Sequence, residues 1–347
     1  MVFFVQKVLR RVAGNWTFVV VTARMTLAEF LIALFPDRRA YLGSTLDTLM
    51  RRWTNVTAGL AISALLLTSR VASAAEPFFF IQLSDPQFGM FTDNRDFAQE
   101  TANFEFAAAT VNRLCPAFVV ITGDLVNKPG DAAQIAEYQR ILRRVDSSIP
   151  VYNVAGNHDL DNVPTPARIA AYTNQFGPDH YTFQYAGFVG IVLDSVVIHS
   201  PQQTTNQLAE QERWLRVELE HARQSKARHI VIFAHHPWFL KAAGEPDEYF
   251  NIPRERRAAY LALFREFGVK NLFSGHYHRN AVAREGDLEA VTTGPVGKPL
   301  GEGKSGLRVV IVRDDRIEHR YYDFGELPNR IDLGAVESQR ATSPSAR

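Results

Sequence analysis

Five short segments of the sequence combine, in a fixed order, residue types that bind divalent metal ions. Each segment directly follows an apolar run that is typical of a β-strand. The segments are Asp85-Pro86-Gln87, Gly123-Asp124, Gly156-Asn157-His158-Asp159, His235-His236-Pro237 and Gly275-His276-Tyr277-His278. Together they supply carboxylate, amide and imidazole groups, enough for two adjacent cations. A pair of cations is suited to attack on phosphate esters, which makes this the chemistry that the segments predict.

The elements that must position these segments are recognisable from apolar periodicity and turn signals. The run 118–122 is apolar throughout, which is typical of a strand buried on both faces. We predict helices over about 96–114, 131–145, 207–225 and 254–267, and strands over 78–83, 118–122, 151–154, 181–185, 189–194, 230–234, 271–274, 289–292, 307–313 and 317–322. This order favours an α/β (α+β) fold, in which two mixed β-sheets pack face to face with helices outside. Ligands gather at the carboxyl ends of strands, so such a fold can bring together segments spread over about 190 residues.

Composition and charge are those of a globular protein without a nucleic-acid-binding surface. The 347 residues are 46% hydrophobic and 22% charged, with a formal net charge of +1. The first 74 residues carry nine Lys/Arg and three acidic residues, so the remaining body is mildly acidic. A mildly acidic body with no basic stripe argues against a nucleic-acid partner.

The single cysteine, Cys115, excludes an intrachain disulfide. It lies at the end of a predicted helix, between Leu114 and Pro116. We expect it to be buried as a small apolar residue, since a reactive thiol needs a partly exposed, electropositive setting.

Residues 50–75 have the pattern of a secretory signal peptide. Met50-Arg51-Arg52 is followed by an apolar stretch from Val56 to Leu67 and by small residues ending at Ala74 and Ala75. The apolar stretch is short for a membrane span, although an uncleaved N-terminal anchor remains an alternative. The pattern predicts export, with cleavage near Ala74 or Ala75 and a periplasmic or extracellular location.

Residues 1–49 precede this signal, which is unusual because a signal peptide normally begins the chain. One explanation is that translation starts at Met50 and that residues 1–49 are an over-extended N-terminus. The other is an amphipathic arm, since 2–9 and 18–35 contain apolar clusters with interspersed arginine. At the other end, residues 329–347 are small and polar and are predicted to be a disordered tail.

The five segments, in this order, resemble the calcineurin-like metallophosphoesterase superfamily. The resemblance covers about residues 78–324. The phrase Ser84-Asp85-Pro86-Gln87-Phe88-Gly89 is most similar to the branch of calcineurin-like phosphoesterase-domain-containing serine/threonine phosphatases, as are Phe176-Gly177-Pro178, Leu193-Asp194-Ser195, Gln211-Glu212 and Trp214-Leu215. The resemblance implies a four-layer sandwich, two mixed sheets flanked by helices, in a domain spanning residues 76–328.

The resemblance also implies a role for each residue of the segments. Two divalent metal ions, Mn, Fe or Zn rather than Ca, would share a bridging hydroxide that attacks the phosphoester. Asp85, Gln87 and His278 would bind the first metal, Asp124 would bridge both, and Asn157, His235 and His276 would bind the second. His158 would donate a proton to the leaving group, and Asp159 would accept from the other nitrogen of that ring. His236 is a weaker candidate for metal contact.

The sequence departs from the superfamily pattern at a few positions. Gln87 stands where the first motif usually has histidine, and its carbonyl oxygen is a harder, weaker ligand; we therefore expect this site to prefer Mn²⁺ or Mg²⁺. Asn127 stands where purple acid phosphatases have a metal-bound tyrosine, which indicates that the chain is not one of them. Lys128 lies where related protein phosphatases have a phosphate-binding arginine, and we interpret it as a solvated loop residue.

Outside the segments, most candidate residues have an ordinary structural interpretation. Five histidines belong to no motif and are expected to be structural or at the surface: His180, His199, His221, His229 and His319. The polar loop 241–256 follows the fourth segment, and its Tyr249, Phe250 and Arg254 are candidates for the substrate rim.

The function that these patterns predict is hydrolysis of phosphomonoesters, from a small molecule or a phosphoprotein. A phosphodiesterase acting on nucleotides or glycerophosphodiesters is one alternative. A catalytically silent binding protein of the cell envelope is another, supported only by Gln87. A purely structural role would leave many buried polar groups without partners, which is costly.

Overall fold

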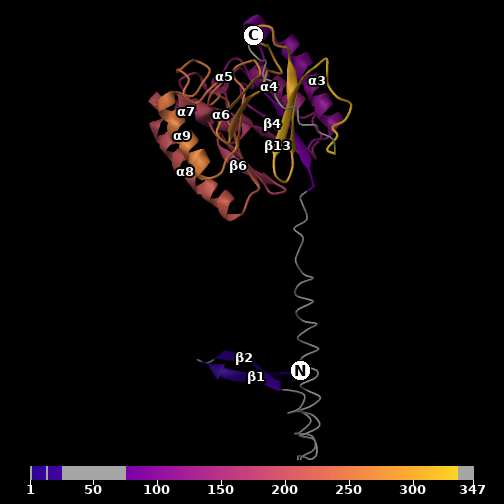
Figure 1. Cartoon of the computed structure of the whole chain (residues 1–347), viewed down its shortest axis with the longest axis vertical. Helices are drawn as coiled ribbons and strands as arrows, with labels where there is room; N and C mark the ends of the chain where they lie inside the picture. Colours follow the sequence, from indigo (N-terminus) through magenta and orange to yellow (C-terminus); the bar gives the residue numbers. More distant parts are fainter. Residues whose placement is uncertain (1, 13–14, 26–75, 335–347) are drawn as a thin grey trace, which may run out of the picture. The chain divides into compact units, whose positions relative to one another are not determined.

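The computed structural model describes residues 2–12, 15–25 and 76–334 (Figure 1). The chain divides into two compact units, Met1–Ser73 and Ala74–Arg347. In the first unit, strands β1 (Val2–Val12) and β2 (Asn15–Met25) form an antiparallel hairpin. The predicted signal or anchor segment, 50–75, lies outside the described residues. Within the part of the chain that is described, we find no helix with the length and apolar character needed to span a bilayer.

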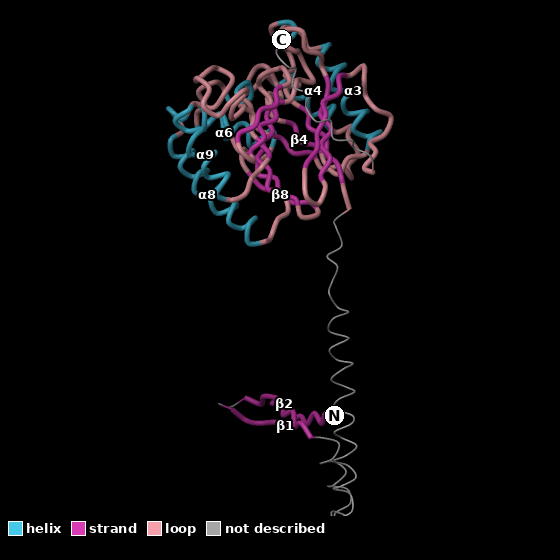
Figure 2. Tube along the Cα trace, in the orientation of Figure 1, coloured by secondary structure: helices cyan, strands magenta, loops and turns pink. Residues whose placement is uncertain are grey.

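The second unit is built on two β-sheets that lie between layers of helices (Figure 2). Strand order in the first sheet is β13-β12-β3-β4-β5: Ile317–Asp323, Gly306–Val312, Phe78–Leu83, Val119–Ile121 and Val151–Asn153. In the second sheet it is β10-β11-β9-β8-β7-β6: Ala281–Glu285, Leu288–Thr292, Asn271–Ser274, His229–Phe233, Phe188–Val192 and Tyr181–Tyr185. Both sheets combine parallel and antiparallel pairs, so the expectation of two mixed sheets is confirmed.

Alternation along the strands explains why the sheets pack face to face. In β3, Phe80 points into the cluster between the sheets, while Phe79 and Ile81 point outward toward the helices. This period of two is the geometry of a pleated strand with both faces buried. The cluster between the sheets is rich in aromatic residues, with Phe80, Phe118, Phe188, Phe233 and Phe273 all buried.

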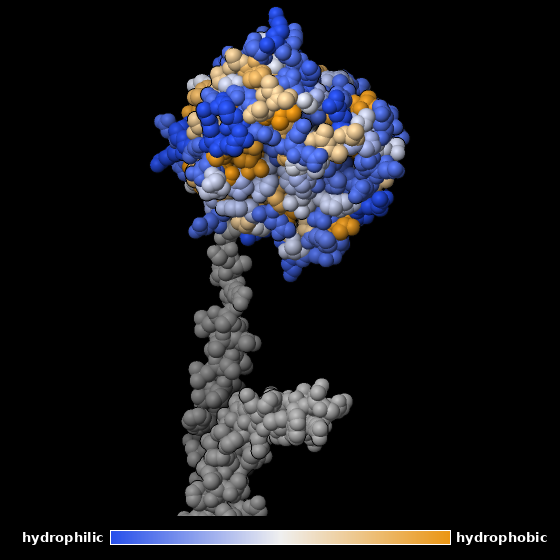
Figure 3. All heavy atoms as spheres, turned by 180° about the vertical axis from the view of Figure 1, so that it is seen from behind, coloured by the Kyte–Doolittle hydropathy of each residue, from blue (hydrophilic) through white to orange (hydrophobic). Residues whose placement is uncertain are grey.

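Helices cover the outer faces of both sheets and complete four layers. Residues of α3 (Ala98–Leu114), α4 (Ala132–Leu142) and α6 (Pro166–Phe176) pack on the first sheet. Those of α8 (Thr205–Gln224) and α9 (Arg254–Glu266) pack on the second. On the face seen in Figure 3, hydrophilic side chains cover most of the body and hydrophobic ones form scattered patches. The apolar residues of the helices are therefore mainly buried in the core, as in other folded domains.

Several short elements near the strand ends were not predicted from the sequence. They are α5 (Asn157–Leu160), α7 (Ser195–His199), the 3₁₀ turns η2 (Met90–Thr92) and η3 (Pro201–Gln203), and the edge strand β10. Helix α6 was also missed, although Thr165 caps it by accepting a hydrogen bond from the Arg168 N–H at 3.2 Å. Elements of three to five residues are too short for apolar periodicity to reveal them.

Two expectations about single segments need correction. Cys115 is exposed and not buried, because it ends helix α3 in a left-handed conformation with φ of 55°. The ordered body also continues beyond Asn329. Ile331 and Leu333 pack against the first-sheet core, and the Leu333 carbonyl accepts a hydrogen bond from Arg313 at 2.8 Å. The part of the predicted tail beyond Gly334 lies outside the described residues.

Candidate metal centre

The five motif segments converge because each leaves the carboxyl end of a strand at the same edge of the sandwich. The strands concerned are β3, β4 and β5 of the first sheet and β8 and β9 of the second. Hydrogen bonds join the loops: Gln87 N–H donates to the Asp124 carbonyl at 2.8 Å, and Gly275 N–H donates to the His235 carbonyl at 3.0 Å. The loops therefore form one interlocked unit and not a set of independent turns.

Backbone conformation in these loops is unusual and concentrated at the motif residues. Five of them adopt positive φ between 40° and 65°: Asp85, Gln87, Asp124, His276 and His278. For residues with a Cβ this region costs about 1–3 kcal/mol each, so it persists only where surrounding contacts hold it. Strain of this kind gathered in one place indicates a functional site.

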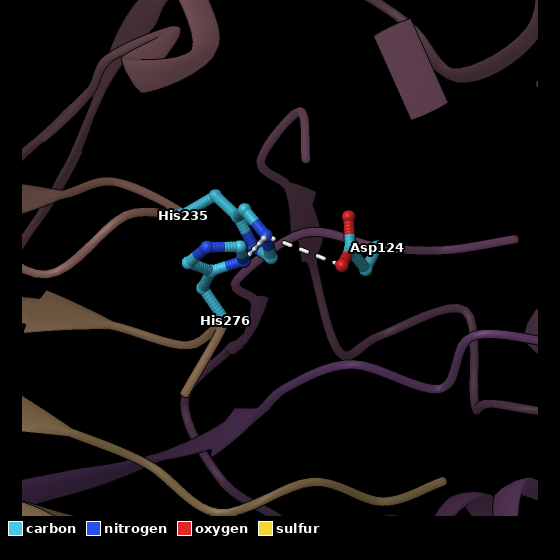
Figure 4. A group of neighbouring side chains, drawn as sticks. All are labelled: Asp124, His235 and His276. Atoms are coloured by element: carbon cyan, nitrogen blue, oxygen red, sulfur yellow. Dashed lines mark hydrogen bonds and ion pairs between the residues drawn. The ribbon is translucent and has the colours of Figure 1, made fainter. Parts of the chain in front are cut away.

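Two groups of buried side chains in this unit have the geometry of metal sites. One is Asp85, Asp124 and His278, and the other is Asp124, His235 and His276; within each, one ligand atom per residue lies within 4.8 Å of the others. Asp124 belongs to both groups. Figure 4 shows it facing His235 and His276, with the His235 Nε2 atom 3.3 Å from Asp124 Oδ2 and 3.1 Å from His276 Nδ1. A carboxylate shared in this way is what two adjacent cations require.

Each of the three histidines has one ring nitrogen committed to a backbone carbonyl. His235 Nδ1 contacts the Thr122 carbonyl at 2.8 Å, His276 Nε2 the Tyr249 carbonyl at 3.1 Å, and His278 Nδ1 the Lys298 carbonyl at 2.6 Å. A carbonyl only accepts, so in the neutral ring the proton stays on that nitrogen. In the neutral ring the opposite nitrogen is a lone-pair donor facing the cluster, which is the arrangement that metal-binding histidines need. For His235, burial would lower the pKa, but Asp124 and Asp85 outweigh it and raise this pKa to about 9, so a cation must displace the second proton of that ring.

Electrostatics in the cluster favour the ligand forms of two residues. Burial alone would raise the pKa of Asp124, but His235 and His158 outweigh it and hold this pKa below its ordinary value. Burial, followed by repulsion from His235, lowers the pKa of His276 to about 3. Asp124 is therefore an anion and His276 a neutral imidazole at physiological pH, as coordination of a cation demands.

The amide nitrogens of Asn157 and Gln87 are engaged by neighbouring residues, which leaves their side-chain oxygens available to other partners. Asn157 donates from Nδ2 to Asn162 Oδ1 at 2.9 Å and to the Tyr249 hydroxyl at 3.2 Å, and its Oδ1 lies 3.0 Å from His235 Nε2. Gln87 donates from Nε2 to Asn127 Oδ1 at 3.1 Å, while its buried Oε1 has no hydrogen-bond partner in residues 76–334. An orphaned buried oxygen is rare and needs an explanation, and a cation provides one. The donor set thus fits divalent cations.

His158 and Asp159 lie beside the cluster, but they are not paired as predicted. The His158 ring Nδ1 contacts the Asn127 carbonyl at 2.8 Å. The Asp159 carboxylate accepts instead from the backbone N–H groups of Gly156 and Leu125, both at 2.9 Å, and of Val126 at 3.2 Å. Asp159 therefore ties the second motif loop to the third, because its side chain turns back toward the backbone at the start of α5.

Ser195 is a contributor to the site that sequence reasoning missed. Its hydroxyl oxygen accepts from the backbone N–H groups of His235 at 3.0 Å and His236 at 2.9 Å, and lies 3.1 Å from His236 Nδ1. It thereby holds the fourth motif in place, and it turns His236 toward itself rather than into either ligand group. The signal available in the sequence was its position directly after a strand end, next to Asp194.

Lys128 is a solvated loop residue, as interpreted from the sequence. Its side chain is 63% exposed and lies 3.9 Å from Asp131. This separation and exposure describe a weak surface ion pair.

Comparison with known proteins agrees with this geometry. The family model described as calcineurin-like phosphoesterase matches residues 80–280, which contain all five motif segments. The chain belongs to this family. Members hydrolyse phosphoester bonds, so the protein is a metal-dependent hydrolase of phosphoesters.

Curated relatives narrow the resemblance to one branch of the calcineurin-like phosphoesterase family. The chain is 40% identical over 269 residues to the serine/threonine-protein phosphatase CPPED1 of Bos taurus, covering 73% of this chain and 86% of that protein. It is 37% identical over 270 residues to CPPED1 of Homo sapiens, with the same coverage of each chain. Among solved structures, purple acid phosphatase PPD1 from yellow lupin (Lupinus luteus) has a TM-score of 0.55 at 14% identity, covering 71% of this chain and 52% of that one. This last similarity supports the shared fold alone.

Proposed function

We propose that the protein hydrolyses phosphomonoesters with two divalent cations, drawn from Mn, Fe and Zn, at the cluster described above. The observation that carries the proposal is that Asp124 belongs to both ligand groups. The name of the relatives, serine/threonine-protein phosphatase, supports phosphorylated serine and threonine side chains among the substrates.

We assign the carboxylate and histidine ligands to the cations by the two groups, and the amides Gln87 and Asn157 by the resemblance. Asp85, Gln87 and His278 would hold the first cation, Asn157, His235 and His276 the second, and Asp124 both. When bound, the cations would supply an activated water as nucleophile and neutralise charge on the phosphoryl oxygens.

We assign His158 to act on the leaving group. Its backbone N–H donates to Asp124 Oδ1 at 2.8 Å, which fixes the residue beside the shared carboxylate. The Asn127 carbonyl keeps a proton on Nδ1, so Nε2 is the ring nitrogen through which a proton would be given to the substrate. Donation from Nε2 to the departing alkoxide would lower the barrier for substrates with poor leaving groups.

The experiment that tests the proposal compares a monoester with a diester. Purified protein is stripped of metal, reloaded with Mn²⁺, Fe²⁺ or Zn²⁺, and assayed with p-nitrophenyl phosphate and bis-p-nitrophenyl phosphate. We expect a higher kcat/KM for the monoester. Preference for the diester would replace the proposal by a phosphodiesterase, and no turnover of either would favour a silent binding protein.

We propose further that the protein is exported and that residues 50–75 are its signal. The charged start, apolar stretch and small residues at the end of this segment support the proposal, as does the boundary between the two compact units at Ser73 and Ala74. N-terminal sequencing of the native product tests it. A mature chain beginning near Ala75 is expected, whereas peptides from residues 1–49 in the mature product would contradict it.

A further inference from the structure

We infer that Tyr249 is a positioning residue for the second cation, through which the loop 240–252 controls how tightly that cation is held. The inference rests on the two-cation function proposed above. Tyr249 contacts two of the second cation's ligands at once, with its side chain on Asn157 and its backbone on His276.

The contact with Asn157 decides which way its carboxamide faces. Asn157 Nδ2 carries two hydrogens; one is used by Asn162 Oδ1 at 2.9 Å and the other by the Tyr249 hydroxyl oxygen at 3.2 Å. With both donors satisfied, Oδ1 is directed into the cluster, 3.0 Å from His235 Nε2. Without the Tyr249 hydroxyl, one amide hydrogen loses its partner and the orientation is less well determined.

The contact with His276 decides which ring nitrogen faces the cluster. The Tyr249 carbonyl lies 3.1 Å from His276 Nε2, so the neutral ring keeps its proton there and offers Nδ1. The two rings also pack together, with centroids 4.9 Å apart. His278 of the first cation is held instead by the Lys298 carbonyl, from a different loop, so the two cations have separate supports.

The loop that carries Tyr249 is itself built to hold a position. The Glu245 carboxylate accepts from the backbone N–H groups of Leu240 and Lys241 and from Asn251 Nδ2, each at 2.8 Å. Buried Arg257 of α9 donates to the Ile252 carbonyl at 2.9 Å and to the Ala243 carbonyl at 3.1 Å. Because both ends of the loop are anchored, the position of Tyr249 follows from the fold.

Exposure of Tyr249 argues against a role in packing alone. Tyr249 is 52% exposed, whereas the ligands that it contacts are buried. A half-exposed tyrosine contributes little to the stability of a core. The hydrogen bonds of Tyr249 to the ligands therefore explain better why a tyrosine is found at this position. The same exposure allows the phenol to be altered without disturbing the sheets.

The test is calorimetric titration of the metal-stripped full-length protein with Mn²⁺, comparing wild type with Tyr249→Phe. Phenylalanine removes the hydroxyl but keeps the ring and the carbonyl. Removing a partner that orients a metal ligand typically weakens metal affinity 10–100-fold. Because the carbonyl contact remains in Tyr249→Phe, we expect the affinity for one cation to fall about tenfold and the affinity for the other to stay unchanged. Asn162→Ala removes the other hydrogen-bond partner of the Asn157 amide and should weaken binding of the same cation.

The matched control is Tyr185→Phe. Tyr185 is 43% exposed and lies on β6, where its ring packs on Phe78 and Phe118, away from the ligands. This variant should bind both cations as wild type does. The inference would be overturned if Tyr249→Phe bound both cations with wild-type affinity, or if it lost the same affinity for both. Either result would leave the two-cation function intact. If wild-type protein bound fewer than two Mn²⁺ ions, both this inference and the proposed two-cation function would be overturned.

Discussion

At the scale of single residues, Gln87 distinguishes this site from the superfamily pattern with histidine at that position. Its amide nitrogen is engaged by Asn127, and its oxygen is buried without a partner in the described body. An amide oxygen is a hard, neutral ligand, which suits Mn²⁺ or Mg²⁺ better than Zn²⁺. We therefore expect Gln87 to change the metal preference of the site and not to abolish its activity.

Replacing Gln87 by histidine should change that preference. We expect Gln87→His to bind Zn²⁺ at the first site roughly tenfold more tightly, with a smaller change for Mn²⁺, because imidazole is the softer ligand. Competition titrations of the stripped protein with both metals measure this. Unchanged affinity and selectivity would show that the Gln87 oxygen is not a ligand.

His158 should matter most for substrates with poor leaving groups. Loss of a general acid typically costs 10²–10⁴-fold, so His158→Asn should lower kcat for phenyl phosphate about 100-fold. The loss for p-nitrophenyl phosphate should be much smaller, since p-nitrophenolate departs without protonation. An equal loss on both substrates, at unchanged metal content, would assign His158 to substrate binding and not to proton donation.

At the scale of elements, the strands are ordinary and the loops after them are exceptional. Expectations for the long strands and for α3, α4, α8 and α9 were confirmed to within a few residues, because their apolar periodicity is strong. The short helices α5 and α7 were missed, yet they carry His158 and Ser195. Periodicity in the sequence therefore predicts the long strands and helices more easily than the loops and short helices that carry the candidate site residues.

The close packing of those loops leads to a prediction at Gly156. A Cβ there would collide with the backbone nitrogen and a carboxylate oxygen of Asp124. Gly156→Ala should therefore displace the shared ligand, and a displacement of about 1 Å costs about 100-fold in activity. The readouts are kcat/KM on p-nitrophenyl phosphate and the number of Mn²⁺ ions bound.

Gly244→Ala is the matched control for this variant. A Cβ at Gly244 meets nothing within 4 Å, so its activity should equal that of wild type. If Gly156→Ala were as active as Gly244→Ala, the contact between the second and third motif loops would not position Asp124.

At the scale of the whole molecule, the site is carried by one of the two compact units, Ala74–Arg347. The family model and the curated relatives match this body, and its three apolar clusters are made of residues from 78 to 333. Nothing in the described metal centre comes from residues before 76. We therefore expect the chemistry not to depend on the N-terminal part.

A chain that begins at Glu76 should therefore fold and work alone. We expect its melting temperature and its kcat/KM on p-nitrophenyl phosphate to match those of the full-length protein, because the core and ligand residues described above all lie at or after residue 78. Differential scanning calorimetry and steady-state kinetics measure these. A truncated chain that is unfolded, or folded but inactive, would assign the N-terminal residues a part in the body.

The sequence by itself determined the chemical class of the site and the architecture that carries it. The local sequence is enough to predict candidate ligands such as Asp124, His235 and His276 and the strands before them. The period of a strand and the donor chemistry of a side chain do not depend on a distant partner. Only the tertiary structure decided that Asp159 holds backbone N–H groups and not His158, and that Tyr249 reaches Asn157. Those contacts depend on where loops up to 92 residues apart meet in space, and no period in the sequence encodes that.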